Sequence, residues 1–363
     1  MFFIFIFAFI LSVLIVVHEW GHFYVAKRLG IRVERFSIGF GPKIFGIQKG
    51  ETEYRLSLFP LGGYVKLGGE STEELTGARW EYLSRSVGER TAVVFAGPFL
   101  NYVLAFLIFA IVFMIGNPQT TARIEKVIEG YPAFEEGLLE EDRILLINGQ
   151  TVQYWDDVTK IIHETPEDGM VRLDIQRGEK RLVFNLRPKR IEEKNLFGEV
   201  KQFALIGISP SEEVISVKYP VHQAVGKAAK QMGFITFLTF KAIFRMLTGH
   251  MPIRESLTGP IGIFVITEQA ARLGITYLLQ IVALISTSLA IFNVLPIPVL
   301  DGGHLFFLGI ERLKGSPVSE RVQDVSRQVG MALLLALMVV VFYNDFSRFG
   351  VFEKLSNFFR GLK

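Results

Sequence analysis

Two histidines and a glutamate near the start of the chain could form the centre of a hydrolytic metal site. His18 and His22 stand four residues apart, so on a helix both imidazoles lie on one face and can reach the same metal ion. Glu19 follows directly, where its carboxylate can flank a metal-bound water without ligating the metal. The pattern therefore predicts a zinc site with a proton acceptor beside it.

This H-E-x-x-H pattern lies at the end of a segment that can cross a membrane. Residues 1–17 contain no charge, and the helical pattern continues through the motif to Ala26. Ionisable side chains at membrane depth are costly and are kept mainly for function. A hydrolytic metal in that position indicates a substrate that is itself in the membrane.

The composition favours a membrane protein and excludes several kinds of site. Half of the residues are hydrophobic, the mean hydropathy is +0.36, and 33 are phenylalanine. The net charge of +3 is too small to indicate nucleic-acid binding. Because the chain has no cysteine, it has no disulfide, cysteine nucleophile or thiolate ligand, and a metal must be held by histidine and carboxylate.

Four segments are long and apolar enough to cross a bilayer, which takes about 20 residues. They are Phe2–Ala26, Thr91–Gly116, Ile275–Leu300 and Gln328–Asn344. The basic residues nearest the first segment all follow it: Lys27, Arg28, Arg32 and Arg35. Since basic residues favour the cytoplasmic side, the N-terminus is expected outside, and four crossings place the C-terminus outside too.

The residues between the first two spans are expected to form a cytoplasmic β-region. From Arg32 to Leu67, apolar and polar residues alternate and are interrupted by turns such as Lys49-Gly50. Bare strand edges cannot face lipid, so this sheet must be shielded, interfacial or ready to pair with a partner strand. The simpler alternative is a small cytoplasmic β-domain with no role in catalysis.

Residues 117–215 form the excursion outside the membrane and strongly resemble a PDZ domain. A helix is expected over Trp155–Glu164, followed by a hairpin that joins Met170–Gln176 to Leu182–Leu186. PDZ domains capture extended peptides at a strand edge, but the glycine-rich carboxylate-binding loop typical of them is not evident here. The segment binds a peptide or protein, or it is a spacer that only limits access.

Two further segments are expected at the membrane surface. Val221–Leu247 is a helix candidate with basic residues spread along it, which is typical of an interfacial amphipathic helix. Ser256–Thr267 is a short apolar run at the surface or re-entering the membrane. The expected organisation therefore has eight parts. The first span with the metal motif covers residues 1–27, the β-region 28–90, the second span 91–116 and the PDZ-like domain 117–215. The interfacial segment covers 216–274, the third span 275–300, the cytoplasmic loop 301–327, and the fourth span with the tail 328–363.

A third metal ligand is needed, because catalytic zinc takes three protein ligands and leaves one position for water. Asp301 ends the third apolar run, at the same membrane face as the two histidines. The nearby prolines loosen the helix and the following glycines allow close approach of the backbone. His304, three residues further on, is also within reach.

Together, HEWGH at 18–22 and NVLPIPVLDGGH at 293–304 resemble the signature pair of the site-two protease family of intramembrane zinc metalloproteases. The similarity extends over most of the chain, which looks like the bacterial regulator of sigma-E protease type. One difference is that the better-known members of this subgroup carry two PDZ domains in tandem, whereas this chain has room for one. Gating of substrates by a tandem pair is therefore not expected.

The resemblance implies a role for each residue of the site. His18, His22 and Asp301 would bind zinc, Glu19 would act as general base and acid, and Asn293 would help to hold the substrate backbone. The implied fold is a polytopic α-helical protein of the bacterial inner membrane, with about four transmembrane helices. A cytoplasmic membrane-associated β-region and an extracytoplasmic PDZ-like α+β domain complete it.

The expected activity is cleavage of single-pass membrane proteins, such as anti-sigma factors or remnant signal peptides. A transmembrane substrate must unwind first, and an edge of the β-region, sought in Val33–Ile38 and Arg55–Leu58, could pair with it. The alternative is a non-catalytic membrane adaptor with a structural metal, but such a site needs no base, which Glu19 supplies. Hydrolysis of lipids or prenylated peptides would call for a glutamate-rich motif that the sequence does not contain.

Overall fold

The computed structural model describes residues 2–166, 168–194, 198–252 and 257–350, which form two compact units. Of the described residues, the first unit comprises 2–111, 224–240 and 257–350, and the second comprises the rest, between 112 and 223 and between 241 and 252. The start of the predicted run Ser256–Thr267 and the predicted tail beyond residue 350 lie outside the described residues.

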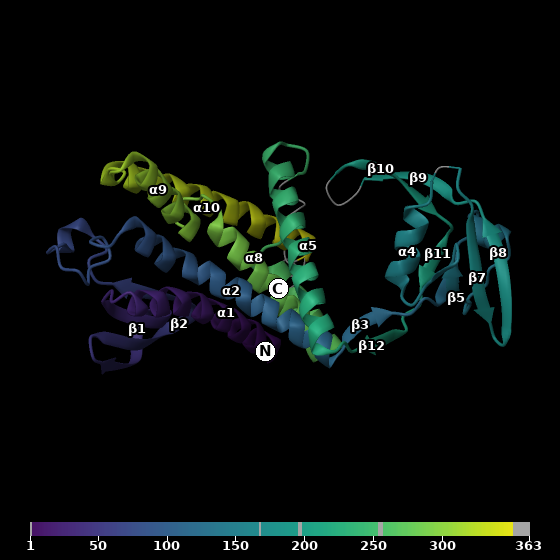
Figure 1. The fold of residues 1–363 in the computed structure, drawn as a ribbon, viewed down its shortest axis with the longest axis horizontal. Coiled ribbons are helices and arrows are strands. Elements are labelled where there is room, and N and C mark those ends of the chain that lie inside the picture. The colour runs from purple at the N-terminus through teal and green to yellow at the C-terminus, as the bar shows by residue number, and fades with distance from the viewer. Residues whose placement is uncertain (1, 167, 195–197, 253–256, 351–363) are drawn as a thin grey trace, which may run out of the picture. The chain divides into compact units, whose positions relative to one another are not determined.

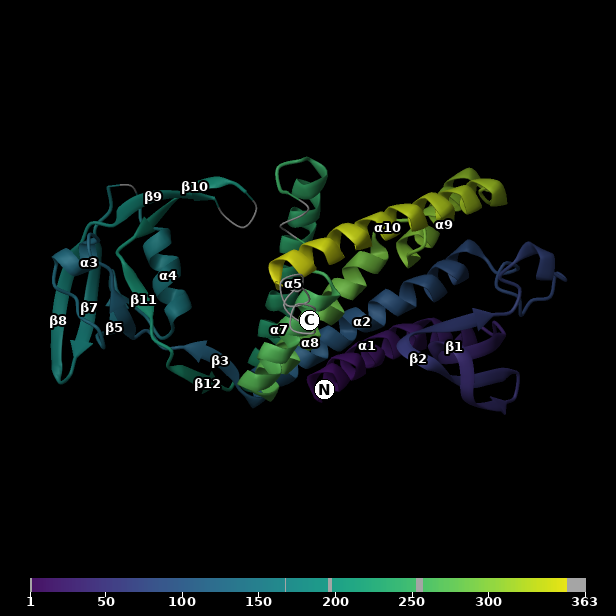
Figure 2. The ribbon, with the colours of Figure 1, turned by 180° about the vertical axis from the view of Figure 1, so that it is seen from behind.

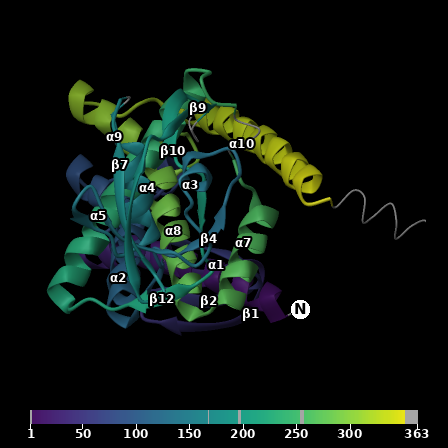
Figure 3. The same ribbon diagram turned by 90° about the vertical axis from the view of Figure 1, so that its right-hand side faces the viewer.

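Long helices dominate the first unit (Figures 1 and 2). Four helices in the described part of the chain are long and apolar enough to cross a membrane: α1 (Phe2–Arg28), α2 (Val87–Ile115), α8 (Ile275–Val294) and α10 (Glu320–Arg348). The unit also contains η1 (Thr72–Glu74), α7 (Pro260–Leu273), α9 (Asp301–Lys314) and the middle of α5 (Val221–Leu247). Helix α7 contacts α1, α8 and α10, and Figure 3 shows it beside α8.

The first two long helices pack closely because of a glycine. A Cβ atom on Gly21 of α1 would collide with the backbone of Ala96 on α2. Small residues at such a position let two helix backbones approach each other, which is the usual way in which membrane helices pack tightly. The metal motif of α1 is thereby held against α2.

The third predicted span ends earlier than expected, and the loop predicted after it is largely helical. Helix α8 ends at Val294 rather than Leu300, because Pro296 and Pro298 donate no hydrogen bond and disfavour helical backbone in the residue before each. The predicted connection from residue 301 to 327 contains helix α9, which begins at Asp301. An acidic residue in a first turn complements the helix dipole, and Asp301 takes that position in α9.

The β-region is a bent hairpin of β1 (Val33–Lys49) and β2 (Thr52–Leu67). Residues 33–38 pair with 63–67 on one side and with 53–56 on the other, and 52–57 pair in turn with 43–49. The segment order across the sheet is therefore 63–67, 33–38, 53–56 and 43–49. The pairing edges predicted in Val33–Ile38 and Arg55–Leu58 are wrong, since both segments are already paired on two sides, and the edges are 63–67 and 43–49.

The second unit is a small α+β fold built on short strands. They are β3 (Asn117–Thr120), β4 (Ile124–Val127), β5 (Arg143–Ile147), β6 (Gln150–Thr151), β7 (Val171–Arg177), β8 (Lys180–Leu186), β9 (Lys189–Lys194), β10 (Val200–Leu205), β11 (Ile208–Pro210) and β12 (Val214–Val217), with helices α3 (Pro132–Glu135) and α4 (Trp155–His163). The largest sheet has the order β6-β5-β7-β8. Helix α4 and the β7–β8 hairpin match the predicted helix and hairpin within one or two residues.

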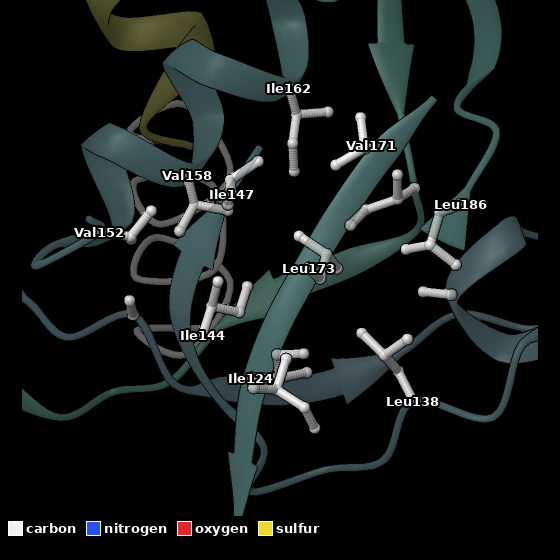
Figure 4. Packing of buried hydrophobic residues seen from close by; sticks show 14 of the residues in the cluster. Ile124, Leu138, Ile144, Ile147, Val152, Val158, Ile162, Val171, Leu173 and Leu186 are labelled. Carbon is white, nitrogen blue, oxygen red and sulfur yellow. The ribbon is translucent and has the colours of Figure 1, made fainter. Parts of the chain in front are cut away.

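Alternating side chains form the core of this second unit. Ile144 and Ile147 of β5, together with Leu173 of β7, are fully buried, and Val158 and Ile162 of α4 pack into the same cluster (Figure 4). The strand period of two and the helical spacing of four place these residues on one face of each element. The unit has its own hydrophobic core.

Candidate metal centre

Three side chains from two helices converge in the first unit. His18 and His22 lie one turn apart on α1, and Asp301 is the first residue of α9. The Nε2 atoms of the two histidines are 3.2 Å apart, and Asp301 Oδ2 lies 3.0 Å from the first and 3.6 Å from the second. All three side chains are mostly buried, with exposed fractions of 10%, 14% and 19%.

This donor set fits a zinc ion. Ligands about 2.0–2.1 Å from a tetrahedral zinc lie roughly 3.3 Å from one another, close to the three spacings here. Asp301 Oδ2 is buried and accepts no well-aligned hydrogen bond, although two ring nitrogens face it. A cation among the three atoms would compensate for this buried, unpaired oxygen. The chemistry of the set, two imidazoles and one carboxylate, is that of catalytic zinc sites.

The segment before Asp301 is tightly folded and strained. A Cβ atom on Gly303 would lie 2.6 Å from the carbonyl oxygen of Ile297, so only glycine permits this close approach. Val299 has a φ of +96°, a region that a β-branched residue enters at a cost of about 1–3 kcal/mol. The surrounding structure thus fixes the direction from which Asp301 enters the site.

Helix α2 supports both histidines from one face. Val93, Gly97 and Asn101 are spaced by four residues, so they lie along the same side of the helix. The Nδ1 atom of His22 lies 2.9 Å from the carbonyl oxygen of Val93, which can accept its hydrogen. Gly97 leaves the space for the imidazoles, because a Cβ atom there would collide with His22 Nε2 and lie 2.9 Å from His18 Nε2.

Glu19 lies beside the three converging groups and against the sheet. The backbone of Val65 on β2 hydrogen-bonds to its carboxylate. Gly63 makes this possible, since a Cβ atom there would lie 3.2 Å from Glu19 Cγ. Glu19 therefore lies between the metal-ligand candidates and the sheet edge 63–67. This position suits a general base and acid.

A cavity of about 1190 Å³ opens onto these residues. His18, Glu19, His22 and Asp301 line its floor, and residues 64–67 of the sheet edge form one wall. Other walls come from residues 70–75, from α9 and from residues 317–327. The cavity is large enough to admit an extended stretch of polypeptide.

The loop between β2 and α2 is organised by one buried carboxylate. Glu81 is fully buried and accepts hydrogen bonds from the amides of Thr76, Gly77 and Ala78 and from the hydroxyls of Thr76 and Ser84, at 2.6–3.1 Å. These donors, above all the Thr76 hydroxyl, hold the pKa of Glu81 below its usual range. The following residues, Tyr82 and Leu83, line the cavity, so this carboxylate shapes one of its walls.

An ion pair ties α2 to α9. Arg90 and Glu311 are both largely buried and form two parallel hydrogen bonds between guanidinium and carboxylate. Arg90 also donates to the carbonyl oxygen of Arg85 at 3.1 Å. Because α9 carries Asp301 and α2 supports the histidines, this pair helps to fix the two halves of the site relative to each other.

The remaining predicted residues lie outside the converging group. His304 lines the cavity but is absent from the group of three whose ligand atoms lie within 4.8 Å of one another. Asn293 is half-buried on the last turn of α8, and the described residues that line the cavity do not include it. The sequence reasoning missed Val93, Gly97, Asn101 and Glu81; the only available signal was a glycine, at position 97, inside an apolar helix.

Comparison with known proteins identifies the family of this chain. Residues 6–337 match the profile described as peptidase family M50. The chain is 37% identical to a Campylobacter jejuni protein named as a zinc metalloprotease, over 93% of this chain and 92% of the relative. It is 32% identical to regulator of sigma-E protease RseP of Salmonella typhimurium, over 93% of this chain and 97% of the relative.

The alignment with the Salmonella typhimurium protein spans 442 residues, so this relative contains inserted residues that the 363-residue chain lacks.

Among solved structures, a PDZ domain of an SdrC-like protein from Listeria monocytogenes matches 26% of this chain. The match covers 90% of that domain's chain, at 19% identity and a TM-score of 0.22. The predicted resemblance to the site-two proteases is confirmed by the sequence relatives. The chain belongs to peptidase family M50 and is a zinc metalloprotease.

Proposed function

We propose that this protease cuts single-pass membrane proteins within or near the bilayer. The observation that carries the proposal is the position of the converging group: His18 and His22 lie on a helix that is apolar enough to span a membrane. A substrate that reaches them must come from the membrane or its surface. The third group, Asp301, begins a helix directly after another such span.

In this proposal His18, His22 and Asp301 hold the zinc, and Glu19 moves the proton. Zinc supplies a Lewis acid that polarises a carbonyl group and lowers the pKa of water. The Glu19 carboxylate takes the proton from the attacking water and returns it to the leaving amine. The buried surroundings of the site limit competing bulk water, and Asn293 helps to hold the substrate backbone.

The substrate is delivered as an extended strand. A helix that enters the site must give up its internal hydrogen bonds, and each buried group left unpaired costs about 1–3 kcal/mol. In the described part of the chain no strand pairs with the outer side of residues 63–67, which line the cavity beside Glu19. Pairing along this edge would replace the lost hydrogen bonds and orient the peptide towards the zinc ligands.

The substrate class follows from the relatives and from the second unit. Relatives of this chain are named regulator of sigma-E protease, which supports anti-sigma factors, already trimmed outside, as substrates. Remnant signal peptides have the same form, a single span with a short outer stub. The PDZ-like residues 117–215 would act outside the membrane as a size filter or as a receptor for an extracytoplasmic peptide or protein.

The proposed arrangement places the site at the cytoplasmic side of the bacterial inner membrane. The β-region of residues 28–90 and the segment 301–327 would be cytoplasmic, residues 216–274 would lie at the outer surface, and both termini would be outside. The asymmetry of basic residues after α1 supports this orientation. Spans at 1–27, 91–116 and 275–300, and a fourth span followed by a tail over 328–363, complete the organisation.

The alternative function is that of a non-catalytic adaptor with a structural metal. The two functions differ in what they require of Glu19, because a structural site needs ligands but no base. Glu19→Gln removes the proton acceptor and leaves the three ligands untouched. We expect it to retain zinc and to slow cleavage by about 10²–10⁴-fold.

Co-expression with tagged single-pass membrane proteins, comparing the native chain with Glu19→Gln, tests this directly. Zinc in the purified variant is measured in parallel. A variant that lacks zinc would show that Glu19 acts in metal binding rather than as a base. A variant that is zinc-loaded and as active as the native chain would exclude Glu19 from the chemistry.

A further inference from the structure

A buried amide lies against the first histidine of the metal motif, on the side away from the converging group. Asn101 of α2 is fully buried, and its Nδ2 atom lies 3.4 Å from His18 Nδ1. Its Oδ1 atom is buried without any hydrogen-bond partner among the described residues. In this orientation the carbonyl oxygen makes no hydrogen bond, and the amide nitrogen faces the ring.

The buried amide has two possible orientations, because the oxygen and nitrogen of an asparagine side chain are assigned from the hydrogen-bond network. A histidine that binds a metal through Nε2 carries its hydrogen on Nδ1, and this hydrogen needs an acceptor. With Oδ1 towards the ring, the amide of Asn101 accepts the hydrogen of His18 Nδ1. The proton then resides on Nδ1, and Nε2 carries the lone pair that faces Asp301 and the metal position.

The second histidine shows the same arrangement with a backbone acceptor. His22 Nδ1 lies 2.9 Å from the carbonyl oxygen of Val93, eight residues before Asn101 on the same face of α2. Helix α2 therefore presents one acceptor to each imidazole, a backbone carbonyl for His22 and a side-chain amide for His18. Gly97, midway between the acceptors, gives both rings room.

The position of Asn101 is itself fixed from a third helix. Ser286 of α8 is buried, and its hydroxyl donates to the backbone carbonyl of Asn101 at 2.8 Å. The buried amide thus has a fixed backbone, as a group that orients a ligand must. We propose that Asn101 is a positioning residue for the metal site, which accepts the Nδ1 hydrogen of His18 and so holds its Nε2 lone pair towards the ion. This inference rests on the proposed ligand set.

The test is zinc affinity, measured without reference to proteolysis. The full-length chain and its variants are purified in detergent, stripped of metal and titrated with zinc against a chromophoric chelator. Asn101→Leu keeps the shape but removes the acceptor, and we expect zinc affinity to fall about 10–100-fold. Asn101→Asp keeps an acceptor and removes the donor, and we expect affinity close to native. Gly88→Ala, on the same helix and with open space around its Cβ position, serves as the control and should bind zinc normally.

The two Asn101 variants separate an acceptor from a donor or a packing residue. If Asn101→Asp lost as much affinity as Asn101→Leu, the amide would act as a donor and the proposal would be overturned. Native affinity in Asn101→Leu would overturn it as well. If the leucine variant does not fold, as judged by thermal unfolding of the metal-free protein, the aspartate variant alone decides. His18→Ala is titrated alongside: if it kept native affinity, the ligand set itself would fail, which is a different outcome.

Discussion

At the scale of single residues, the proposed zinc ligands could be predicted from the sequence, but the residues that support them could not. His18, Glu19 and His22 follow a fixed spacing, and Asp301 follows an apolar run that was predicted to end at the same membrane face. The spacing and the predicted topology were enough to group them. The contacts of Gly97 and Asn101 with the histidines follow no motif, because they depend on how α2 rotates against α1. Only the packed structure reveals them.

Gly97 offers a test of this packing. A methyl group at position 97 would collide with His22 Nε2 and crowd His18 Nε2, so the rings must move and their donor atoms no longer converge. We expect Gly97→Ala to weaken zinc binding by at least about tenfold. Gly88→Ala, on the same helix but with open space around its Cβ position, is the control and should bind zinc normally. Equal affinities in the two variants would contradict the packing described here.

At the scale of elements, the sequence predicted well which segments are helical or extended. It predicted less well where helices end and which strand segments pair. The range of α5 is the predicted Val221–Leu247. The helical character of α9 was not predicted, because its glycines and the prolines before Asp301 weaken the helical pattern. The pairing order of the β-region was also missed, since a bent hairpin lets one segment pair on both sides and no local pattern encodes that.

Glu81 makes the stability of the loop before α2 dependent on pH. Its pKa lies below the ordinary value of 4.5 in the folded chain, so its stabilising contribution is present above that value and is lost as the pH falls through the folded pKa. We expect Glu81→Gln to lower the thermal unfolding temperature at neutral pH. The difference from the native chain should shrink below pH 4.5. A difference that does not change with pH would contradict this role.

Pairing of the substrate with the sheet edge 63–67 can be tested by cross-linking. Tyr64 lies on the edge that lines the cavity, and Gln48 lies on the opposite edge. The chain has no cysteine, so Tyr64→Cys and Gln48→Cys each introduce a single thiol. With single cysteines placed along a substrate in the Glu19→Gln background, we expect disulfides near the scissile bond from position 64 and not from position 48. Equal cross-linking at both positions would reject delivery along this edge.

At the scale of the whole molecule, the family and the four apolar helices agree with the sequence-based prediction. The division into spans and soluble parts could be predicted because apolar length is a one-dimensional property of the chain. The side of the membrane on which each part lies depends on a charge asymmetry that is strong only after α1, where Lys27 and Arg28 end the helix.

Labelling of single thiols tests the proposed orientation. Gln153 is an exposed residue of the second unit, and Gln48 is an exposed residue of the β-region. We expect a membrane-impermeant thiol reagent to label Gln153→Cys in intact cells and Gln48→Cys only after the membrane is broken. The reverse pattern would invert the orientation and place the metal site at the outer side.

The central claim is that His18, His22 and Asp301 together hold the catalytic zinc. The most direct measurement is the zinc content of the purified full-length chain, compared with Asp301→Ala and its control His304→Ala. We expect about one zinc per chain in the native protein and in His304→Ala, and little in Asp301→Ala, because two imidazoles alone hold zinc poorly. Zinc that stays in Asp301→Ala and is lost from His304→Ala would contradict the claim and assign the third ligand to His304.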